Sequence, residues 1–232
     1  MRLKPFFSYY GAKYYISPSY PSPSFKTIIE PFAGSAQYAL LYWDRNIKLF
    51  DLDENIVMLW DYLIHVKERE ILSLDLSWDY IDDSKLTSTQ KILVGYWITQ
   101  GSARPKKKKS SFFHINGIDW RVRVASQLTY IRHWKIEKKS FEEIEDISGT
   151  WFIDPPYQEA GKHYRRSKID YSLLSNWCLS RKGEIIVCEN KGADWLPFQP
   201  FKNTNKTQKN TISKEVVYHT VQSKQLRLWD NL

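Results

Sequence analysis

The chain alternates between short apolar runs and longer segments whose apolar residues recur at helical spacing. Apolar runs predict strands over 25–30, 47–51 and 184–188, and the run 151–153 leads directly into a polar turn. From Glu54 onward the helical spacing predicts a helix with one buried face, formed by Ile56, Leu59, Trp60, Leu63 and Ile64. Strands that alternate with helices in this way predict an α/β fold.

Further helices are predicted from caps and spacing. They cover 36–44, where Ser35 could cap the first turn, then 92–98 and 122–134, and a segment that begins after Asp170. The apolar face of the last helix would consist of Leu173, Leu174, Trp177 and Cys178.

Polar segments predict loops over 17–24, 162–168 and 198–210. Near the end of the chain, the apolar runs 216–218 and 226–228 are spaced like the two strands of a closing hairpin. The sequence shows no internal repeat.

Residues 75–147 interrupt the alternation of strands and helices and predict an inserted region. The stretch 104–109 within it packs five positive charges into six positions. The whole chain carries a net charge of +8 with a pI of about 9.2, and 16% of its residues are aromatic, which favours a polyanionic partner. A charge run of this kind is usually a solvated loop, but here it also suits a phosphate-contacting arm. The candidate nucleic-acid contacts are Arg104, Lys106, Lys107, Lys108, Lys109, Arg121 and Arg123.

The cysteines and histidines exclude some chemistries. Cys178 and Cys188 have no CxxC spacing, so we expect a buried, reduced pair in a cytoplasmic protein. The five histidines show no ligand-like pairing, and we therefore expect no metal. No apolar stretch approaches membrane-spanning length, which predicts a soluble protein without a membrane partner.

The turn Asp154-Pro155-Pro156-Tyr157 is the strongest candidate for chemistry. It follows a buried strand, and open α/β sheets place their sites at such strand ends. The prolines fix the direction of the backbone carbonyls, so the turn offers a carboxylate, a fixed acceptor and a flat ring. This set suits a planar base with an exocyclic amine. The alternative is a strand with a proline-rich turn and a core tyrosine.

A second candidate site lies at the first two strand ends. Pro31-Phe32-Ala33-Gly34-Ser35 forms a glycine turn, and Asp51 ends the next strand about twenty residues later, where nucleotide-binding folds hold a ribose. The pattern GxGxxG itself is absent. The alternative is a purely structural role, in which Asp51 and Asp53 are a helix N-cap and its solvated neighbour.

With these motifs in order, the chain resembles the Dam-like, alpha-class DNA N6-adenine methyltransferases. The resemblance rests on Tyr9-Tyr10-Gly11-Ala12-Lys13, on Glu30-Pro31-Phe32-Ala33-Gly34-Ser35, which contains the glycine turn, and on Asp51 and Asp154–Tyr157. It implies a Rossmann-like S-adenosylmethionine-dependent methyltransferase fold with a mostly parallel seven-stranded sheet and a C-terminal hairpin. It also implies a catalytic domain of 1–74 and 148–232, with 75–147 as a mainly helical target-recognition region.

The resemblance further implies the roles of individual residues. Catalysis falls to Asp154, Pro155, Pro156 and Tyr157. S-adenosylmethionine would contact Tyr9, Lys13, Pro31, Phe32, Ala33, Gly34, Asp51 and Asp154. The chain departs from the family pattern at Tyr9, where tryptophan is usual, and at Ser35-Ala36, where a second small residue such as glycine is usual.

The expected activity is methylation of the N6 amine of a flipped adenine in DNA, by a protein whose oligomeric state is open with a monomer favoured. Three alternatives remain. Cytosine N4 methylation needs the same acceptors, although its enzymes more often begin this motif with serine; RNA adenine methylation needs the same pocket. A DNA-binding module on an inactive scaffold would not be stabilised by S-adenosylhomocysteine.

Overall fold

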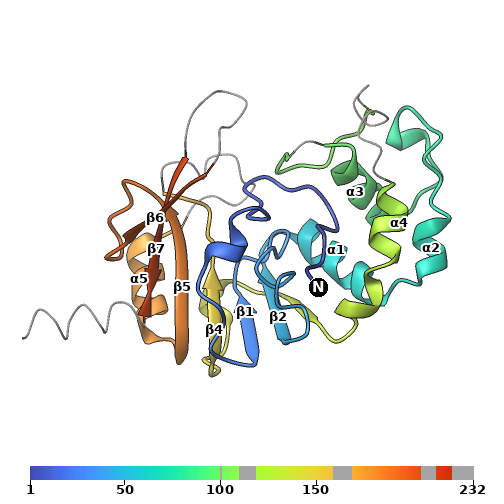
Figure 1. Ribbon diagram of the computed structural model, residues 1–232. Coiled ribbons are helices and arrows are strands. Elements are labelled where there is room, and N and C mark those ends of the chain that lie inside the picture. Colours follow the sequence, from blue (N-terminus) through green and yellow to red (C-terminus); the bar gives the residue numbers. More distant parts are fainter. Residues whose placement is uncertain (100, 110–118, 159–168, 205–212, 221–232) are drawn as a thin grey trace, which may run out of the picture.

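The computed structural model describes residues 1–99, 101–109, 119–158, 169–204 and 213–220. Its centre is a seven-stranded sheet with the strand order β3-β2-β1-β4-β5-β7-β6 (Figure 1). The strands are β1 (Thr27–Glu30), β2 (Asn46–Asp51), β3 (Lys135–Lys138), β4 (Gly149–Ile153), β5 (Gly183–Asn190), β6 (Gln199–Thr204) and β7 (Ser213–His219). The helices are α1 (Glu54–His65), α2 (Glu68–Leu72), α3 (Ser88–Trp97), α4 (Trp120–Ala125) and α5 (Tyr171–Ser180).

The pairing of the strands confirms the predicted fold class. β1 pairs in parallel with β2 and β4, β2 with β3, and β4 with β5, whereas β7 is antiparallel to both β5 and β6. A mostly parallel sheet in this order, with an antiparallel pair at its end, is the Rossmann-like S-adenosylmethionine-dependent methyltransferase fold.

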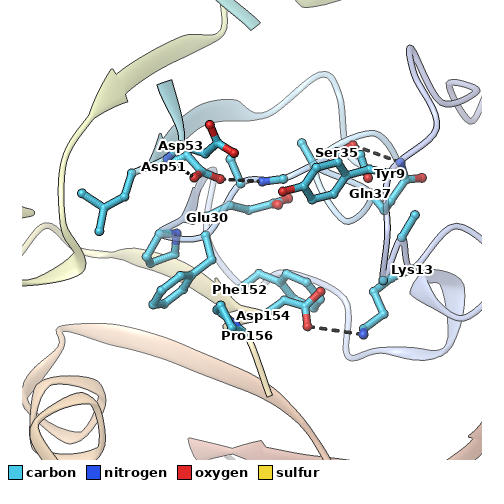
Figure 2. A pocket seen from close by; sticks show the side chains of 18 of the residues that line it. Tyr9, Lys13, Glu30, Ser35, Gln37, Asp51, Asp53, Phe152, Asp154 and Pro156 are labelled. Carbon is cyan, nitrogen blue, oxygen red and sulfur yellow. Dashed lines mark hydrogen bonds and ion pairs between the residues drawn. The ribbon is translucent and has the colours of Figure 1, made fainter. Parts of the chain in front are cut away.

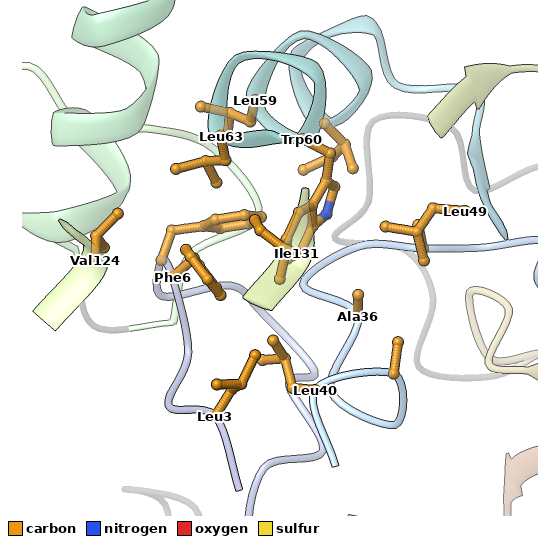
Figure 3. Packing of buried hydrophobic residues seen from close by; sticks show 14 of the residues in the cluster. Leu3, Phe6, Ala36, Leu40, Leu49, Leu59, Trp60, Leu63, Val124 and Ile131 are labelled. Atoms are coloured by element: carbon orange, nitrogen blue, oxygen red, sulfur yellow. The ribbon is translucent and has the colours of Figure 1, made fainter. Parts of the chain in front are cut away.

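Apolar layers cover both faces of the sheet, which explains why the central strands β1, β4 and β5 read as nearly continuous apolar runs. Consecutive strand residues point to opposite faces, so Ile28 joins one buried cluster and Ile29 the other. The first cluster packs α1 and the N-terminal segment against the sheet, as Figure 3 shows for Trp60 and Phe6. The second packs α5 through Trp177.

The carboxyl ends of the parallel strands bring distant residues to one edge of the sheet. Glu30 ends β1, Asp51 ends β2, and Asp154 follows β4 directly. The chain order reverses between the neighbours β1 and β4, and at such a switch point the loops diverge and leave a crevice. β7 runs the other way, so its residue Glu215 pairs with Asn190 at the same edge.

The helix predicted over 36–44 is wrong. This segment is a series of turns, because Ala36 has a φ of 47°, in the left-handed region, and because tertiary contacts hold the segment. The Ala39 N–H donates to the buried Glu30 carboxylate at 2.7 Å. The Tyr38 ring stacks on Phe152 with 4.2 Å between centroids. Packing here overrides local helix propensity.

The helix predicted over 122–134 is shorter than expected. It ends at Ala125, and a single 3₁₀ turn, Leu128–Ile131, follows. Between them the Gln127 side chain donates to the carbonyls of Arg123 and Lys4, which ties the chain to the N-terminal segment.

The closing hairpin has a different partner from the predicted one. β7 contains 216–218 as expected, but it pairs with β6, which lies in the predicted loop 198–210. A polar edge strand lacks the apolar alternation that marks a strand in the sequence. The predicted partner 226–228 and the predicted loop 162–168 lie outside the described residues.

The region 75–147 contains α3 and α4, which lie beside α1 and away from the middle of the sheet (Figure 1). Helices are therefore its main regular elements among the described residues, although β3 belongs to the central sheet. The division at 75 and 147 stays a prediction. No helix in the described part of the chain is long and apolar enough to cross a membrane.

Candidate active site

One pocket lies at the switch point between β1 and β4, and every residue that the sequence assigned to the cofactor borders it (Figure 2). Its wall consists of Tyr9, Tyr10, Gly11, Ala12, Lys13, Glu30, Pro31, Phe32, Ala33, Gly34, Ser35, Ala36, Gln37, Asp51, Leu52, Asp53, Lys139, Phe141, Phe152, Asp154 and Pro156. The four segments that resemble the methyltransferase motifs thus meet around a single space.

The glycine turn is shaped so that its backbone borders the pocket. Gly34 has a φ of 45°, and a Cβ at this position would lie 3.3 Å from the Tyr9 ring. Its N–H donates to Asp51 at 3.0 Å, and its carbonyl accepts from the Trp60 indole at 2.9 Å. The turn therefore has little freedom and leaves room for a ligand beside Tyr9.

Asp51 and Asp53 divide the two roles that the sequence left open. Asp53 caps α1 by accepting from the Asn55 N–H, as the structural reading expected. Both residues border the pocket, but the Asp51 carboxylate does not cap the helix: one of its oxygens accepts from the Gly34 N–H and the other from the Asp53 N–H at 2.8 Å. Burial raises the pKa of Asp51 to about 6 against the lowering effect of these N–H donors.

Glu30 lies beneath the pocket and is only 3% exposed. Burial raises its pKa to about 8, although the Ala39 N–H favours the ionised form. The side chain is therefore protonated in the folded protein at neutral pH, whereas in the unfolded chain it ionises near pH 4.5.

We expect Glu30→Gln to stabilise the protein, and to do so more at pH 8 than at pH 5. As the pH rises from about 4.5 to about 8, folding of the wild type requires uptake of a proton, so its stability falls. Glutamine has no such requirement. At about 1.4 kcal/mol per pKa unit, the gain at pH 8 is a few kcal/mol. Urea unfolding at both pH values measures it, and an equal difference at the two would contradict the shift.

Asp154 lies where the pocket meets the polar turn. It accepts from the Lys13 ammonium in an ion pair of 3.4 Å (Figure 2). Burial raises the pKa of Asp154 to about 6, with Lys13 lowering it and Glu215 raising it. The next residues are held by α5, because the Tyr171 hydroxyl donates to the Pro156 carbonyl at 2.6 Å.

The two other predicted catalytic residues, Pro155 and Tyr157, are not among the residues of the pocket wall. Pro155 is buried. The Tyr157 hydroxyl donates to Glu215 on β7 at 2.6 Å, and the Lys13 ammonium lies 4.5 Å from the centre of the Tyr157 ring. Lys13 thus contacts both Asp154 and the ring, and it forms a second ion pair, of 3.5 Å, with Glu215.

Lys139, Phe141 and Glu215 are among the residues of this site that sequence reasoning missed. Phe141 and Lys139 border the pocket because they follow β3, a polar edge strand that was not predicted. Glu215 reaches the site only because β7 is antiparallel to β5. The only apolar residue of β3 is Ile136, which lies between charged residues. Recognition of this strand would have pointed to Lys139 and Phe141, because sites of open α/β sheets lie at the carboxyl ends of their strands.

Four of the seven predicted nucleic-acid contacts lie against the segment 74–82: Lys107, Lys108, Lys109 and Arg121. Lys107 pairs with Asp82 at 2.9 Å and the Lys109 ammonium lies over Trp78, while Arg121 donates to the Leu74 carbonyl. The exposed members are Arg104, Lys106, Lys107 and Lys108. Arg121 also pairs with Asp119, and Arg123 lies over Trp120.

No family model matches the chain, and no curated protein matches it. Among solved structures, it aligns with a proposed methyltransferase, yhhF, from Escherichia coli at 11% identity and a TM-score of 0.36, over 83% of this chain and 74% of the other. It aligns with a conserved hypothetical protein from Streptococcus pyogenes at 11% identity and a TM-score of 0.36, over 87% of this chain and 88% of the other. It also aligns with a proposed methylase, HI0767, from Haemophilus influenzae at 12% identity and a TM-score of 0.34, over 83% of this chain and 78% of the other. At these TM-scores the likeness carries no argument, and the fold assignment rests on the strand order.

Proposed function

We propose that this protein transfers a methyl group from S-adenosylmethionine to the N6 amine of an adenine in DNA. One observation carries the proposal. The Asp154–Pro156 turn borders the same pocket as the glycine turn and Asp51, so acceptors suited to an exocyclic amine lie beside groups suited to a nucleoside cofactor.

The chemistry of the pocket fits S-adenosylmethionine. Asp51 would accept from the ribose hydroxyls, as acidic residues at this strand end do in nucleotide-binding folds. Aromatic side chains from separate segments, Phe32, Phe141 and Tyr9, offer flat surfaces for the adenine ring. The tight approach of Gly34 to Tyr9 shows that a larger residue would intrude on this space.

Asp154 supplies the part of the mechanism that the amine needs. An adenine amine is a weak nucleophile because its lone pair is delocalised into the ring. When bound, S-adenosylmethionine supplies an electrophilic methyl group on a sulfonium sulfur, which keeps the bonding electrons as the methyl leaves. Asp154 accepts a hydrogen of the amine and orients its lone pair, and Tyr157 offers its ring to the base. With a pKa of about 6, Asp154 can also take up the proton that the methylated amine releases.

An adenine inside a duplex cannot reach a recessed carboxylate, so the base must leave the stack. Opening the duplex requires contacts to the backbone, and the exposed lysines of 106–108 are suited to phosphates. The net charge of +8 supports a polyanionic substrate in the same way.

We expect neutralising Lys106 to Lys109 together, as glutamines, to weaken DNA binding at least tenfold at 0.1 M salt. The slope of log K against log salt should fall by up to about 3.6, which is about 0.9 for each phosphate that these lysines neutralise. The fall should be smaller if the pairing of Lys107 with Asp82 persists in the complex. Titration at several salt concentrations measures it.

A charge-matched variant controls for net charge alone. Four exposed lysines outside 104–109 serve this purpose when changed to glutamine: Lys26, Lys67, Lys135 and Lys182. An equal change in slope for both variants would remove the basic run from the interface.

The proposed function is tested with S-adenosylmethionine that carries a labelled methyl group. The protein is incubated in turn with DNA and with RNA, and each polymer is digested to nucleosides for mass spectrometry. We expect label in N6-methyldeoxyadenosine. Label in N4-methyldeoxycytidine or only in RNA adenosine would replace the proposed substrate, and no transfer together with no thermal stabilisation by S-adenosylhomocysteine would reject an enzyme.

A further inference from the structure

Glu215 is a buried carboxylate to which the mechanism above gives no role. It is 4% exposed and lies near the start of β7, opposite Asn190. One of its oxygens, Oε1, accepts from the Tyr157 hydroxyl at 2.6 Å and from the Tyr20 hydroxyl at 2.7 Å. The same oxygen lies 3.5 Å from the Lys13 ammonium.

Lys13 lies between this carboxylate and Asp154. Its ammonium is 3.4 Å from Asp154 and 4.5 Å from the centre of the Tyr157 ring, and its side chain is only 11% exposed. The proposed function assigns Asp154 to the target amine and the Tyr157 ring to its base. In this structure the lysine ammonium therefore occupies the place of the amine as a donor to Asp154.

Lys13 contacts one Asp154 oxygen, Oδ1. If the target amine takes this oxygen as its acceptor, Lys13 must give up that contact. A buried ammonium without a counter-ion is costly, so Lys13 needs another carboxylate within reach. Glu215 is that carboxylate, and it already contacts Lys13.

We propose that Glu215 is a positioning residue, which fixes the Tyr157 ring and retains the Lys13 ammonium when Asp154 turns to the target amine. This inference rests on the proposed function. Before the target base binds, Lys13 pairs with Asp154 and keeps this carboxylate ionised and oriented. After the base binds, Lys13 pairs with Glu215 alone of these two carboxylates.

The charge balance around Asp154 gives a readout that does not depend on catalysis. Its titratable neighbours come from several elements and are Lys13, Tyr20, Glu30, Tyr157, Cys188, Glu189 and Glu215. Among these, Lys13 lowers and Glu215 raises the pKa of Asp154. Removing the charge of Glu215 takes away one of the two carboxylates that form these ion pairs with Lys13.

The experiment compares Glu215→Gln with Glu184→Gln by carbon NMR of the Asp154 carboxyl in the cofactor-free protein. Glu184 is a matched control, because it is also buried on the sheet but pairs with His219 beside Thr150, about 13 Å from Asp154 at 3.3 Å per strand residue. We expect the Asp154 pKa to fall below about 6 in Glu215→Gln and to stay unchanged in Glu184→Gln. No fall in Glu215→Gln, or the same fall in both, would overturn the proposal.

Methyl transfer gives the second readout. In Glu215→Gln we expect kcat to fall tenfold or more at pH 7, with the Kd for S-adenosylhomocysteine unchanged within twofold, because Lys13 stays on Asp154. A lower Asp154 pKa leaves more of this carboxylate ionised, which by itself would not slow methyl transfer. The fall in kcat therefore reports that Lys13 is retained on Asp154, and not that the Asp154 pKa has changed. Glu215→Asp, which keeps the charge, should recover part of kcat. An unchanged kcat in Glu215→Gln would overturn the proposal, whereas a wild type that transfers no methyl group would reject the proposed function instead.

Lys13→Met keeps the proposal testable if Glu215→Gln fails to fold. Lys13 lies in a loop, so its removal affects packing less than a change within β7. We expect the Asp154 pKa to rise above its wild-type value in this variant, and no rise would overturn the role of Lys13.

Discussion

Asp154→Ala is expected to lower methyl transfer at least a thousandfold while it leaves the affinity for S-adenosylhomocysteine within about threefold of wild type. Removal of one positioned transition-state partner typically costs a hundredfold to a thousandfold. Here the same carboxylate also takes up the released proton. Single-turnover transfer and calorimetric titration with S-adenosylhomocysteine measure the two quantities separately.

Asp61→Ala is the matched control, because Asp61 is an exposed aspartate on α1 outside the pocket wall. It should match wild type in both measurements. Equal losses of transfer and of cofactor affinity in Asp154→Ala would instead assign Asp154 a structural role in the pocket.

Asp51→Ala is expected to raise the Kd for S-adenosylhomocysteine about 100-fold. The variant lacks a charged acceptor for the ribose and leaves the N–H groups of Gly34 and Asp53 without their acceptor. Hydrogen bonds to a charged group contribute roughly 1.5–3 kcal/mol, and 1.4 kcal/mol is tenfold in affinity. Calorimetry at pH 7.5, where Asp51 is ionised, measures the change.

Asp119→Ala separates this effect from the removal of a backbone acceptor in general. Asp119 caps α4 by accepting from the Arg121 N–H, and it lies outside the pocket wall. The variant should lose about 1 kcal/mol of stability and no cofactor affinity. If Asp51→Ala binds S-adenosylhomocysteine as tightly as Asp119→Ala, the assignment of Asp51 to the ribose is wrong.

The pocket could be anticipated from sequence because its main residues lie at the ends of parallel strands. Glu30, Asp51 and Asp154 each end or directly follow an apolar run, and the carboxyl ends of parallel strands share one edge. Local pattern thus defines both the element and the position of the side chain.

Other features depend on contacts that a local pattern does not contain. The turns at 36–44 arise from the stacking of Tyr38 on Phe152 and from the buried Glu30, both distant in sequence. Glu215 reaches Tyr157 through the antiparallel pairing of β7 with β5, which the sequence did not indicate. The polar strands β3 and β6 are the two edge strands of the sheet, and each pairs with a single neighbouring strand. Their sequences therefore contain few apolar residues by which a strand could be predicted.

The exposed basic residues illustrate a further limit. The run 104–109 is visible in the sequence, but its contacts with the segment 74–82 are not. Those contacts determine which of its charges remain available to a phosphate, and hence how strongly each should contribute to the salt dependence.

The central claim is that Asp154 holds the amine of an extruded adenine beside the methyl donor. A crystal structure of the protein with an unreactive analogue of S-adenosylmethionine and adenine-containing DNA tests it most directly. The account predicts an Asp154 oxygen within about 3 Å of N6, with the Lys13 ammonium displaced from Asp154 and still beside Glu215. A mouth filled by the protein's own side chains, or an Asp154 carboxylate turned away from the base, would contradict it.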